Sequence, residues 1–331
     1  MKTFALALGG GGARGLAHIA VIEALDEMGV RPTVIAGTSI GALIGAAYAA
    51  GMRGKDIRHH VIGFAHDWGE TRRRLMTARA GNLGDLLYGR LSQATQIDAE
   101  KFCEQFMPSQ VPGEFSALGI PFIAMATDLH RRRQLAIASG PLRPALAASI
   151  AIPGLFRPMM IEGRVLIDGG ATNPLPFDKL AGRADRVVGV DVYGIPEGER
   201  VDLPNIWDAL YTTVMVMGSA IVAAKLDHAA PDLLIRPNVS IFRTLGFRQA
   251  SAIIRSAEAM KTEIKEQLAA LCSATLLEKF LEQISGRRLG QSSIDLRAVM
   301  AAGRSKKLHA VLNRPALGIG SAVIQAADPR K

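Results

Sequence analysis

The first ninety residues alternate between short apolar runs and longer segments whose apolar positions recur every three or four residues. Residues 3–8 form an almost wholly apolar run, typical of a strand that is buried on both faces. From 13 to 28 the apolar residues fall on one helical face, and Gly29 ends the pattern. A second strand at 33–36 and a second helix at 40–50 follow. This strand–turn–helix repeat predicts an α/β fold with a parallel sheet.

Further along the chain the pattern is less regular. Later strands are expected at 121–127, 134–138, 164–167, 186–192 and 233–236. Apolar periodicity predicts one amphipathic helix over 251–270, whereas 52–115 shows no clear pattern and is expected to be irregular. The apolar segment 207–226 is interpreted as a core helix in preference to the lining of an acyl groove, although its methionines suit flexible chains.

The composition places the chain among ordinary globular proteins. It has 331 residues, of which 49% are hydrophobic and 21% are charged, enough for a core that needs no disulfides. Cys103 and Cys272 have neither disulfide nor metal spacing, which fits a reducing compartment. Aromatic residues are only 5%, too few for base stacking, so we expect no nucleic-acid partner.

Positive charge is concentrated at the end of the chain. The net charge is +9, and residues 287–331 hold nine basic and two acidic residues, so this segment alone carries +7. We therefore predict a domain over 1–286 and a basic, helical C-terminal extension over 287–331. The extension either contacts an anionic membrane or is a solvated tail that keeps the protein soluble.

The N-terminal region has no targeting pattern that we recognise. Its first apolar stretch is shorter than the ~7–15 residues of a signal-peptide core. Residues 33–52 carry no charge, but they are rich in Gly and Ala and fit a strand, a turn and a buried helix better than a membrane span. We expect a cytoplasmic protein without signal peptide or transmembrane span, with peripheral contact at the inner membrane surface left open.

Glycines follow the first strand in the run Gly10-Gly11-Gly12-Ala13-Arg14-Gly15. The run fits the dinucleotide pattern G-x-G-x-x-G, but residues 28–40 contain no acidic residue to bind a ribose. It also lacks the Lys-Ser/Thr pair of a phosphate loop. What remains is either a tight strand–helix turn without ligand or a set of N–H groups that binds a phosphate or a transient oxyanion.

A second glycine motif follows the second strand. Gly37-Thr38-Ser39-Ile40-Gly41 reads G-x-S-x-G between a strand and a helix, which is the context of a nucleophile elbow. Gly37 and Gly41 would let the helix pass close to the strand, and the sharp turn would expose the Ser39 hydroxyl. Ser39 is therefore the candidate nucleophile.

The base for this serine is not expected to be a histidine. None of the seven histidines lies in a convincing strand-end loop, and His18 is interpreted as a structural residue of the first helix. Asp168 follows an apolar strand and precedes Gly169-Gly170, so it is expected at the carboxyl edge of a parallel sheet, where such sheets place their sites. The alternative is an aspartate that merely caps a turn.

Together these motifs resemble the patatin-like phospholipases, the bacterial members most. The resemblance runs from about Thr3 to Val192, and it includes four segments between and after the motifs: Ala126-Thr127-Asp128-Leu129, Ser139-Gly140-Pro141-Leu142, Ala148-Ser149-Ile150-Ala151-Ile152-Pro153-Gly154-Leu155-Phe156 and Asn173-Pro174-Leu175-Pro176. It implies a three-layer α/β fold. No Cys, His or Asp cluster in the sequence has metal-ligand spacing, so we expect no metal and no cofactor. Residues 287–331 resemble nothing that we can name.

The resemblance also implies a Ser–Asp dyad that works without histidine. Ser39 would attack an ester carbonyl, Asp168 would take its proton, and the N–H groups of Gly10, Gly11 and Gly12 would hold the oxyanion. Arg14 would either support the loop or favour an anionic ester. The glycines with a supporting role are Gly15, Gly37, Gly41, Gly169 and Gly170.

The activity expected from this resemblance is hydrolysis of phospholipid or lysophospholipid esters. Two alternatives remain open: an acyltransferase or thioesterase that uses the same site, and a membrane-binding module whose dyad is silent.

Overall fold

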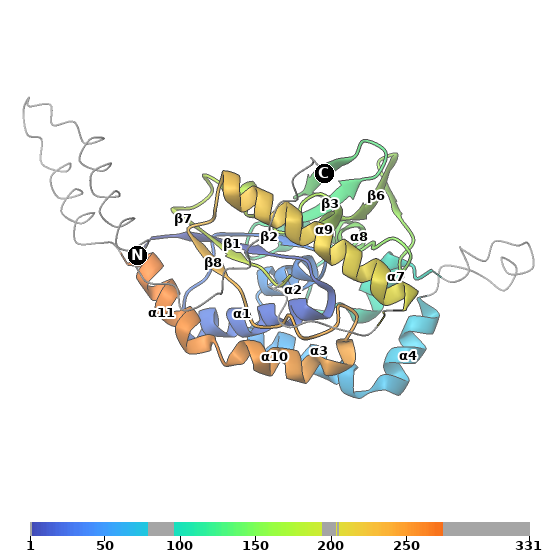
Figure 1. The fold of residues 1–331 in the computed structure, drawn as a ribbon, viewed down its shortest axis with the longest axis horizontal. Helices are drawn as coiled ribbons and strands as arrows, with labels where there is room; N and C mark the ends of the chain where they lie inside the picture. The colour runs from blue at the N-terminus through green and yellow to red at the C-terminus, as the bar shows by residue number, and fades with distance from the viewer. Residues whose placement is uncertain (1, 79–95, 194–202, 204, 274–331) are drawn as a thin grey trace, which may run out of the picture. The chain divides into compact units, whose positions relative to one another are not determined.

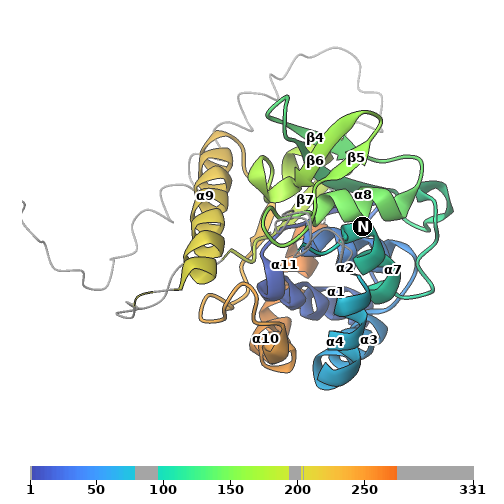
Figure 2. The same ribbon diagram turned by 90° about the vertical axis from the view of Figure 1, so that its right-hand side faces the viewer.

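A mixed eight-stranded sheet forms the centre of the molecule, and helices cover both of its faces (Figures 1 and 2). The structure is a computed structural model that describes residues 2–78, 96–193, 203 and 205–273. The strand order is β5-β6-β3-β2-β1-β7-β8, with β4 paired to β3. The strands are β1 (Phe4–Leu8), β2 (Val34–Thr38), β3 (Phe122–Asp128), β4 (Arg133–Ile137), β5 (Met159–Ile161), β6 (Arg164–Asp168), β7 (Arg186–Val190) and β8 (Leu233–Ile235).

Only part of the sheet is parallel. Strands β3, β2, β1, β7 and β8 run parallel to one another, as the sequence predicts. Strands β4 and β6 both pair antiparallel with β3, and β5 pairs antiparallel with β6. The parallel sheet expected from the sequence is thus present over five strands, and the edge beyond β3 is antiparallel. The short links from β3 to β4 and from β5 to β6 explain why, since a parallel connection needs a crossover of a dozen residues or more.

The three layers are visible in the packing of the core. Alternate residues of β1 point to opposite faces: Leu6 and Leu8 pack with α1, α2, α10 and α11, whereas Ala5 and Ala7 pack with Leu175, Phe177 and the inner side of α9. All five residues of β1 are buried, which accounts for its unbroken apolar sequence. The expected three-layer α/β fold is present.

The helices depart from the expected pattern in two regions. The described parts of 52–115, a region expected to be irregular, contain three helices, and the helix expected over 251–270 is broken at Ala259-Met260. The helices of the described residues are α1 (His18–Glu27), α2 (Ile40–Ala49), α3 (Gly54–His66), α4 (Trp68–Thr77), α7 (Ala99–Phe106), α8 (Leu142–Ser149), α9 (Ile206–His228), α10 (Ala250–Glu258) and α11 (Lys261–Cys272), and a 3₁₀ turn over Gly12–Ala17 precedes α1.

Helix α4 illustrates why these helices escaped prediction. Its sequence is mostly polar, so apolar periodicity gives no signal. The Asp67 side chain caps its N-terminus by accepting a hydrogen bond from the Glu70 N–H, and Glu70 pairs with Arg73 and Arg74 one turn later. Capping and ion pairs stabilise this helix where apolar burial does not.

Helix α9 is not the core helix that its composition suggests. Tyr211, Met215, Gly218 and Val222 form a narrow buried stripe, and most of the other side chains of the helix lie in solvent. Among the described residues, the segment Ala209–His228 alone is long and apolar enough to cross a membrane, with a mean hydropathy of 1.5 and only 22% of it buried. Hydropathy records how apolar a segment is, but it does not record whether anything covers it.

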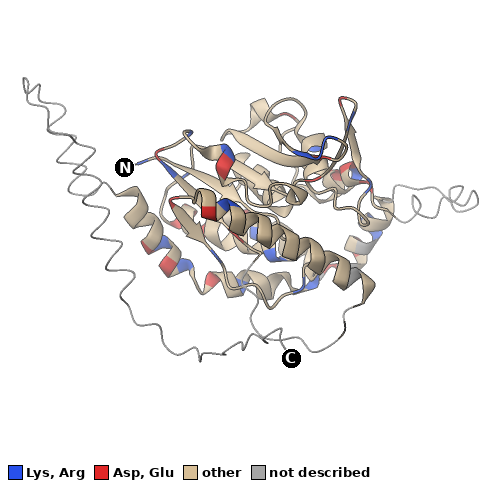
Figure 3. Cartoon of the chain, turned by 45° about the horizontal axis from the view of Figure 1, so that its top comes forward, with Lys and Arg blue, Asp and Glu red and all other residues tan. Residues whose placement is uncertain are grey.

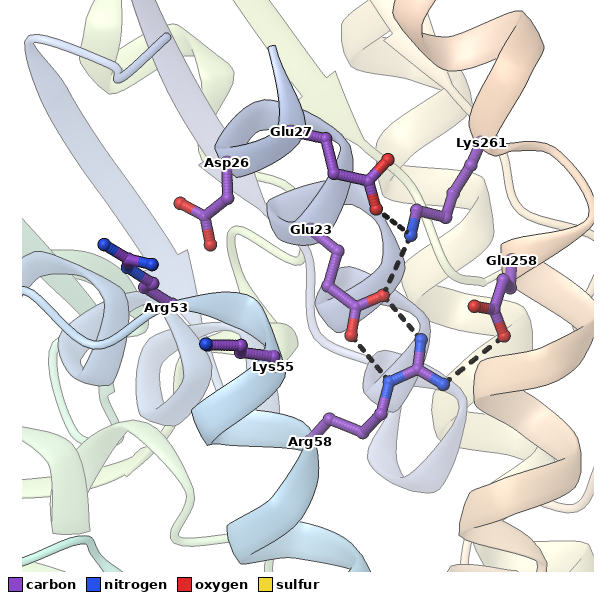
Figure 4. Close-up of a pocket in the computed structure, with 8 residues that line it drawn as sticks. All are labelled: Glu23, Asp26, Glu27, Arg53, Lys55, Arg58, Glu258 and Lys261. Carbon is purple, nitrogen blue, oxygen red and sulfur yellow. Dashed lines mark hydrogen bonds and ion pairs between the residues drawn. The ribbon is translucent and has the colours of Figure 1, made fainter. Parts of the chain in front are cut away.

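Charged side chains tie the C-terminal helices to α1 (Figure 4). Arg58 of α3 donates to both carboxylate oxygens of Glu23 on α1, at 2.6 and 2.5 Å, and to Glu258 of α10 at 3.3 Å. Lys261 of α11 bridges Glu23 and Glu27. These groups line a surface hollow and neutralise one another, so the hollow is a structural ion-pair network.

The predicted basic extension 287–331 lies outside the described residues. Cys103 and Cys272, the two cysteines of the chain, are both free and buried. Burial raises the pKa of the Cys103 thiol to about 12, which keeps this thiol protonated and unreactive at neutral pH.

Candidate active site

Ser39 occupies a sharp turn between β2 and α2. Its φ of 55° and ψ of −126° are unusual for a residue with a side chain, and such strain is typical of a nucleophile elbow. The turn is held from both sides. The Ser39 carbonyl accepts hydrogen bonds from Ala42 and Leu43 in the first turn of α2, and the Ser39 N–H donates to Ser149 Oγ at 3.0 Å.

Glycine is required on both sides of this turn because backbones approach closely there. A Cβ on Gly37 would lie 2.5 Å from the Gly41 carbonyl oxygen, and one on Gly41 would lie 2.3 Å from that of Leu8. Neither position can hold a side chain without moving β1, β2 or α2. The two outer glycines of G-x-S-x-G thus pack the helix against the sheet, as the sequence predicts.

Strand register brings Asp168 level with Ser39. On β3, Met125 is opposite Thr38 of β2, and its neighbour Ala126 is opposite Asp168 of β6. Because Ser39 directly follows Thr38, the two side chains meet across β3, and Ser39 Oγ donates to Asp168 Oδ2 at 2.6 Å.

The expectation that Asp168 sits at the carboxyl edge of a parallel sheet was wrong in its reason. Strand β6 is antiparallel to β3, so its carboxyl end points toward the opposite edge of the sheet. The strand brings the carboxylate to Ser39 because it ends at Asp168, opposite Ala126 of β3.

Asp168 also caps the turn that follows it, so the two interpretations of this residue are compatible. Its second oxygen, Oδ1, accepts a hydrogen bond from the Gly170 N–H at 2.7 Å. The side chain is buried, and burial raises the pKa of Asp168 to about 6, against the hydrogen bonds from Ser39 and Gly170 that lower it. At neutral pH this carboxylate is largely ionised, yet it is a stronger base than an exposed aspartate.

The glycine loop lies directly over Ser39. A Cβ on Gly10 would lie 3.4 Å from Ser39 Cβ. Gly12 has a φ of 58° and lies so close to the Thr244 carbonyl that a Cβ would be 2.2 Å from its oxygen. Gly15 lies against the side chain of Ile40, where a Cβ would be 2.1 Å from Ile40 Cγ2.

One of the three expected oxyanion donors is already occupied. The Gly10 N–H donates to the Pro174 carbonyl at 2.9 Å, because Gly10 still continues the path of β1 beside that segment. The Gly10 N–H is therefore not available to donate to an oxyanion.

Arg14 spans the loops around the glycine run. Its guanidinium donates to the carbonyls of Phe242, Tyr193 and Ser240 at 2.8, 2.8 and 2.9 Å. These contacts favour the loop-supporting role over recognition of an anionic ester, since its donors face backbone carbonyls.

His18 has a structural role, which both its contacts and its protonation state support. It is fully buried in α1, and its Nε2 is 2.8 Å from the Gly9 carbonyl oxygen at the start of the glycine loop. Burial lowers the pKa of His18 to about 4, so the ring is neutral at pH 7 and Nε2 donates this bond. This hydrogen bond ties the start of the glycine loop to α1.

Two residues beside the dyad have no role in the expectations drawn from the sequence. Ser149 accepts the Ser39 N–H from the end of α8, and Tyr193 follows β7. The Tyr193 hydroxyl would lie 3.4 Å from a Cβ on Gly10 and 3.3 Å from one on Gly170, so it stands beside both motifs. Ser149 lies in a quoted family-like segment, which is a signal, whereas no sequence signal singles out Tyr193.

Among the residues that the structure describes, no group of three or more His, Cys, Asp or Glu side chains is placed to hold a metal ion. The chemistry open to this site is that of a hydroxyl, a buried carboxylate and backbone N–H groups. Such a set suits attack on a carbonyl.

Comparison with known proteins agrees with this geometry. The family model described as patatin-like phospholipase matches residues 6–181. The chain belongs to the patatin-like phospholipase family. The match begins in β1 and ends just past η4 (Phe177–Leu180), so it includes the glycine loop, the elbow and Asp168.

Relatives of this patatin-like protein are longer than the chain. An uncharacterized NTE family protein of Mycobacterium bovis is 40% identical over 204 residues, which is 61% of this chain and 52% of that protein. Lysophospholipase nte1 of Aspergillus fumigatus is 33% identical over 198 residues, 59% of this chain and 12% of that protein. The chain thus spans about half of the first relative. The crystal structure of VipD from Legionella pneumophila covers 80% of this chain and 66% of its own, with a TM-score of 0.43 and 15% identity.

Proposed function

We propose that this protein is a serine acyl-hydrolase that cleaves phospholipid or lysophospholipid esters with a Ser39–Asp168 dyad. The observation that carries the proposal is the 2.6 Å hydrogen bond from Ser39 Oγ to Asp168 Oδ2 at a strained strand–helix turn. Membership of the patatin-like phospholipase family supports an ester-hydrolysing activity. The relative named lysophospholipase nte1 supports a lipid ester as substrate.

The proposed reaction has two halves. Asp168 accepts the Ser39 proton while Oγ attacks the ester carbonyl, and the resulting oxyanion accepts hydrogen bonds from the Gly11 and Gly12 N–H groups. The intermediate collapses, the C–O bond breaks, and the leaving alcohol takes the proton from Asp168. Asp168 then accepts a proton from water while the water oxygen attacks the acyl-enzyme carbonyl. As the bond from the acyl carbon to Ser39 Oγ breaks, Asp168 returns this proton to Ser39 Oγ, and the fatty acid is released.

The raised pKa of Asp168 supports its role as the base. A carboxylate of ordinary pKa is a weak base for a hydroxyl. Raising the pKa of Asp168 toward the working pH reduces the difference between its pKa and that of the serine hydroxyl. The close contact of the two side chains adds the advantage of proximity. The first turn of α2, which begins directly after Ser39, adds the positive end of a helix dipole near the developing negative charge.

Our proposal places the reaction in the cytoplasm, at the inner surface of the membrane. Two free, buried cysteines suit a reducing compartment. The substrate class requires contact with lipid, whether in membranes or in micelles.

A lipid-class hydrolysis panel with the Ser39→Ala protein as the blank tests the proposal. Wild-type protein should release fatty acid from at least one phospholipid or lysophospholipid with EDTA present. Ser39→Ala should lose ~10³-fold or more in kcat, as is typical when a nucleophile is removed. Ser109→Ala, on an exposed loop, is the matched control and should keep full activity. Residual Ser39→Ala activity within tenfold of wild type would contradict the assignment, and a preference for an alcohol over water as acceptor would make the protein an acyltransferase.

A further inference from the structure

We propose that α9 and the loop after β8 form a surface that rests on a phospholipid bilayer and brings the Ser39–Asp168 site to it. The proposal rests on the proposed function, since it names the membrane surface as the partner of that site. The apolar surface, as we call it here, consists of two sets of exposed side chains. On α9 they are Ile206, Leu210, Val214, Val216 and Met217, and on the loop they are Ile241, Leu245 and Phe247.

Exposed large apolar side chains are concentrated on these two segments. Within the described residues, all of them except Met76, Leu129 and Met160 lie between 203 and 247. On α9, Ile206 is 79% exposed and Met217 is 60% exposed. Exposed apolar side chains gathered on two segments in this way usually mark a site of interaction with a protein or a membrane.

The pattern along α9 gives the helix two apolar faces. Tyr211, Met215 and Val222 pack into the domain, while Ile206, Leu210, Val214 and Met217 follow one another at helical spacing on an outward face. No charged residue lies between Asp208 and Lys225. Figure 3 shows the helix free of charge along most of its length, with blue and red together near one end.

The helix lies on the bilayer and does not cross it, although it is long enough to do so. Its inner stripe belongs to the core of the domain. Near its end, the Lys225 ammonium donates to Asp178 Oδ1 at 2.5 Å and to the Leu175 carbonyl at 2.6 Å. A membrane-spanning position of α9 would break these contacts between the helix and the domain. A position in the interface of the bilayer keeps them and buries the outer face of the helix.

Both segments of the apolar surface also flank the active site. The loop after β8 packs on the glycine run through the Ala13 N–H, which donates to the Thr244 carbonyl at 2.7 Å, and through Arg14. Helix α9 packs there through Gly218, where a Cβ would lie 2.5 Å from the Tyr193 ring. In Figure 2 the helix and the orange loop lie on the same side of the molecule, at the left. A lipid leaving a bilayer at this surface is therefore beside Ser39.

The charge of the loop region suits a phospholipid headgroup layer. Between Leu233 and Ala250 the chain has three arginines and no acidic residue, and one of them, Arg236, is paired with Asp191. Exposed Arg243 and Arg248 stand on either side of Leu245 and Phe247 in the sequence. An apolar surface edged by arginine matches the boundary between acyl chains and phosphates, which a second protein surface does not offer in the same way.

The test compares the double variant Val214→Asp/Met217→Asp with the matched control Met76→Asp/Met160→Asp, both in the full chain. Co-sedimentation uses phosphatidylcholine vesicles at about 1 M salt, where a Debye length of about 3 Å suppresses binding by basic segments. Hydrolysis is measured on the same vesicles and on a water-soluble short-chain ester. We expect the α9 variant alone to bind vesicles at least tenfold less and to hydrolyse them at least tenfold more slowly, while its short-chain ester activity stays within twofold of wild type.

A labelling experiment keeps the proposal testable if the aspartates impair folding. An environment-sensitive fluorophore on Met217→Cys should shift to the blue when vesicles are added, and the same label on Met160→Cys should not. Equal vesicle binding by both double variants, or no shift at Met217→Cys, would overturn the proposal. The proposal would also fail if wild type were a dimer and the α9 variant a monomer that binds vesicles equally well. The surface would then join two copies of the chain.

Binding by the Ser39→Ala protein separates this proposal from the proposed function. If Ser39→Ala binds vesicles as wild type does, the surface stands whatever the panel of substrates shows. If wild type hydrolyses the soluble ester but binds no vesicles, the catalytic proposal stands and the surface proposal fails.

Discussion

At the scale of single residues, Ser39 and Asp168 each combine a structural role with the chemical role that we propose for it. Ser39 holds a positive φ between a strand and a helix, and its N–H needs the Ser149 hydroxyl as a partner. Asp168 caps the turn at Gly170 with one oxygen and accepts the Ser39 hydroxyl with the other. The capping bond fixes the carboxylate, so the second oxygen is oriented without help from a third residue.

The first residue-scale prediction concerns pH. Asp168 must be ionised to accept a proton, and its pKa is raised to about 6 by burial. Activity should therefore fall as the pH drops through about 6, tenfold for each further unit, in kcat/KM for a soluble ester. His18 cannot cause this limb because its pKa is lowered to about 4. An acid limb that lies near pH 4, or that moves in His60→Gln, would assign the proton transfer to another group.

The second residue-scale prediction concerns Asp168→Asn. The amide cannot accept the Ser39 proton, so activity should fall nearly as far as in Ser39→Ala, ~10³-fold.

The stability of Asp168→Asn should not fall in parallel with its activity. The pKa of Asp168 is higher folded than unfolded, so its ionisation destabilises the native state increasingly as the pH rises from about 4 to about 6. Denaturant unfolding at pH 7 should give Asp168→Asn a free energy of unfolding no lower than wild type. A folded histidine variant as inactive as Asp168→Asn would point to a triad.

At the scale of elements, the site depends on three backbones that nearly touch. The end of β1, the turn at Ser39 and the start of α2 meet at Gly41, with no space for a methyl group. This contact places the glycine loop over Ser39. Because the contact tolerates only glycine, the five-residue motif G-x-S-x-G predicts how two strands and a helix meet at this site.

Gly41→Ala tests this packing. The added methyl would lie 2.3 Å from the Leu8 carbonyl oxygen, so β1 and α2 must separate. We expect a loss of ~2–4 kcal/mol in the free energy of unfolding and of at least tenfold in kcat. Gly63→Ala in α3 is the matched control, since nothing lies within 4 Å of its Cβ, and it should stabilise the helix by up to ~1 kcal/mol. Urea unfolding and soluble-ester kinetics on both proteins would decide, and an unaffected Gly41→Ala enzyme would refute the packing argument.

At the scale of the whole molecule, the C-terminal helices complete a layer that begins at the N-terminus. Helices α10 and α11 pack on α1 and contribute Ile253, Ile254, Ile264 and Leu268 to its core cluster. The ion pairs around Glu23 fasten the same contact at its edge (Figure 4). Residues more than two hundred positions apart thus stabilise one face of the sheet.

Arg58→Met tests this network. It leaves Glu23, whose side chain is 10% exposed, without its bidentate partner, and it also frees Glu258. We expect the free energy of unfolding to fall by ~1–3 kcal/mol, between the values for exposed and buried pairs. Arg73→Met removes an exposed pair with Glu70 and should cost less than ~1 kcal/mol. Equal losses in both proteins by urea unfolding would show that the network adds nothing to the fold.

The sequence by itself determined the elements whose signal is local. The alternation of apolar runs and helical periodicity predicted β1, β2, α1 and α2, since a strand buried on both faces is apolar throughout. The glycine motifs predicted the elbow because only glycine tolerates such close backbones. The polar helix α4 was missed because caps and ion pairs, which apolar periodicity does not detect, stabilise it.

Only the tertiary structure decided what depends on pairing between distant segments. The antiparallel run of β6 sets the level of Asp168, and that level follows from its register with Ala126 on β3. The bond between the Gly10 N–H and Pro174 removes one expected donor. The outer face of α9 is uncovered because nothing in the described part of the domain packs on Leu210, Val214 and Met217, whose hydropathy alone made them resemble core. Strand pairing, strand register and the burial of a helix face each depend on two segments together. The residue pattern within one segment therefore cannot predict them.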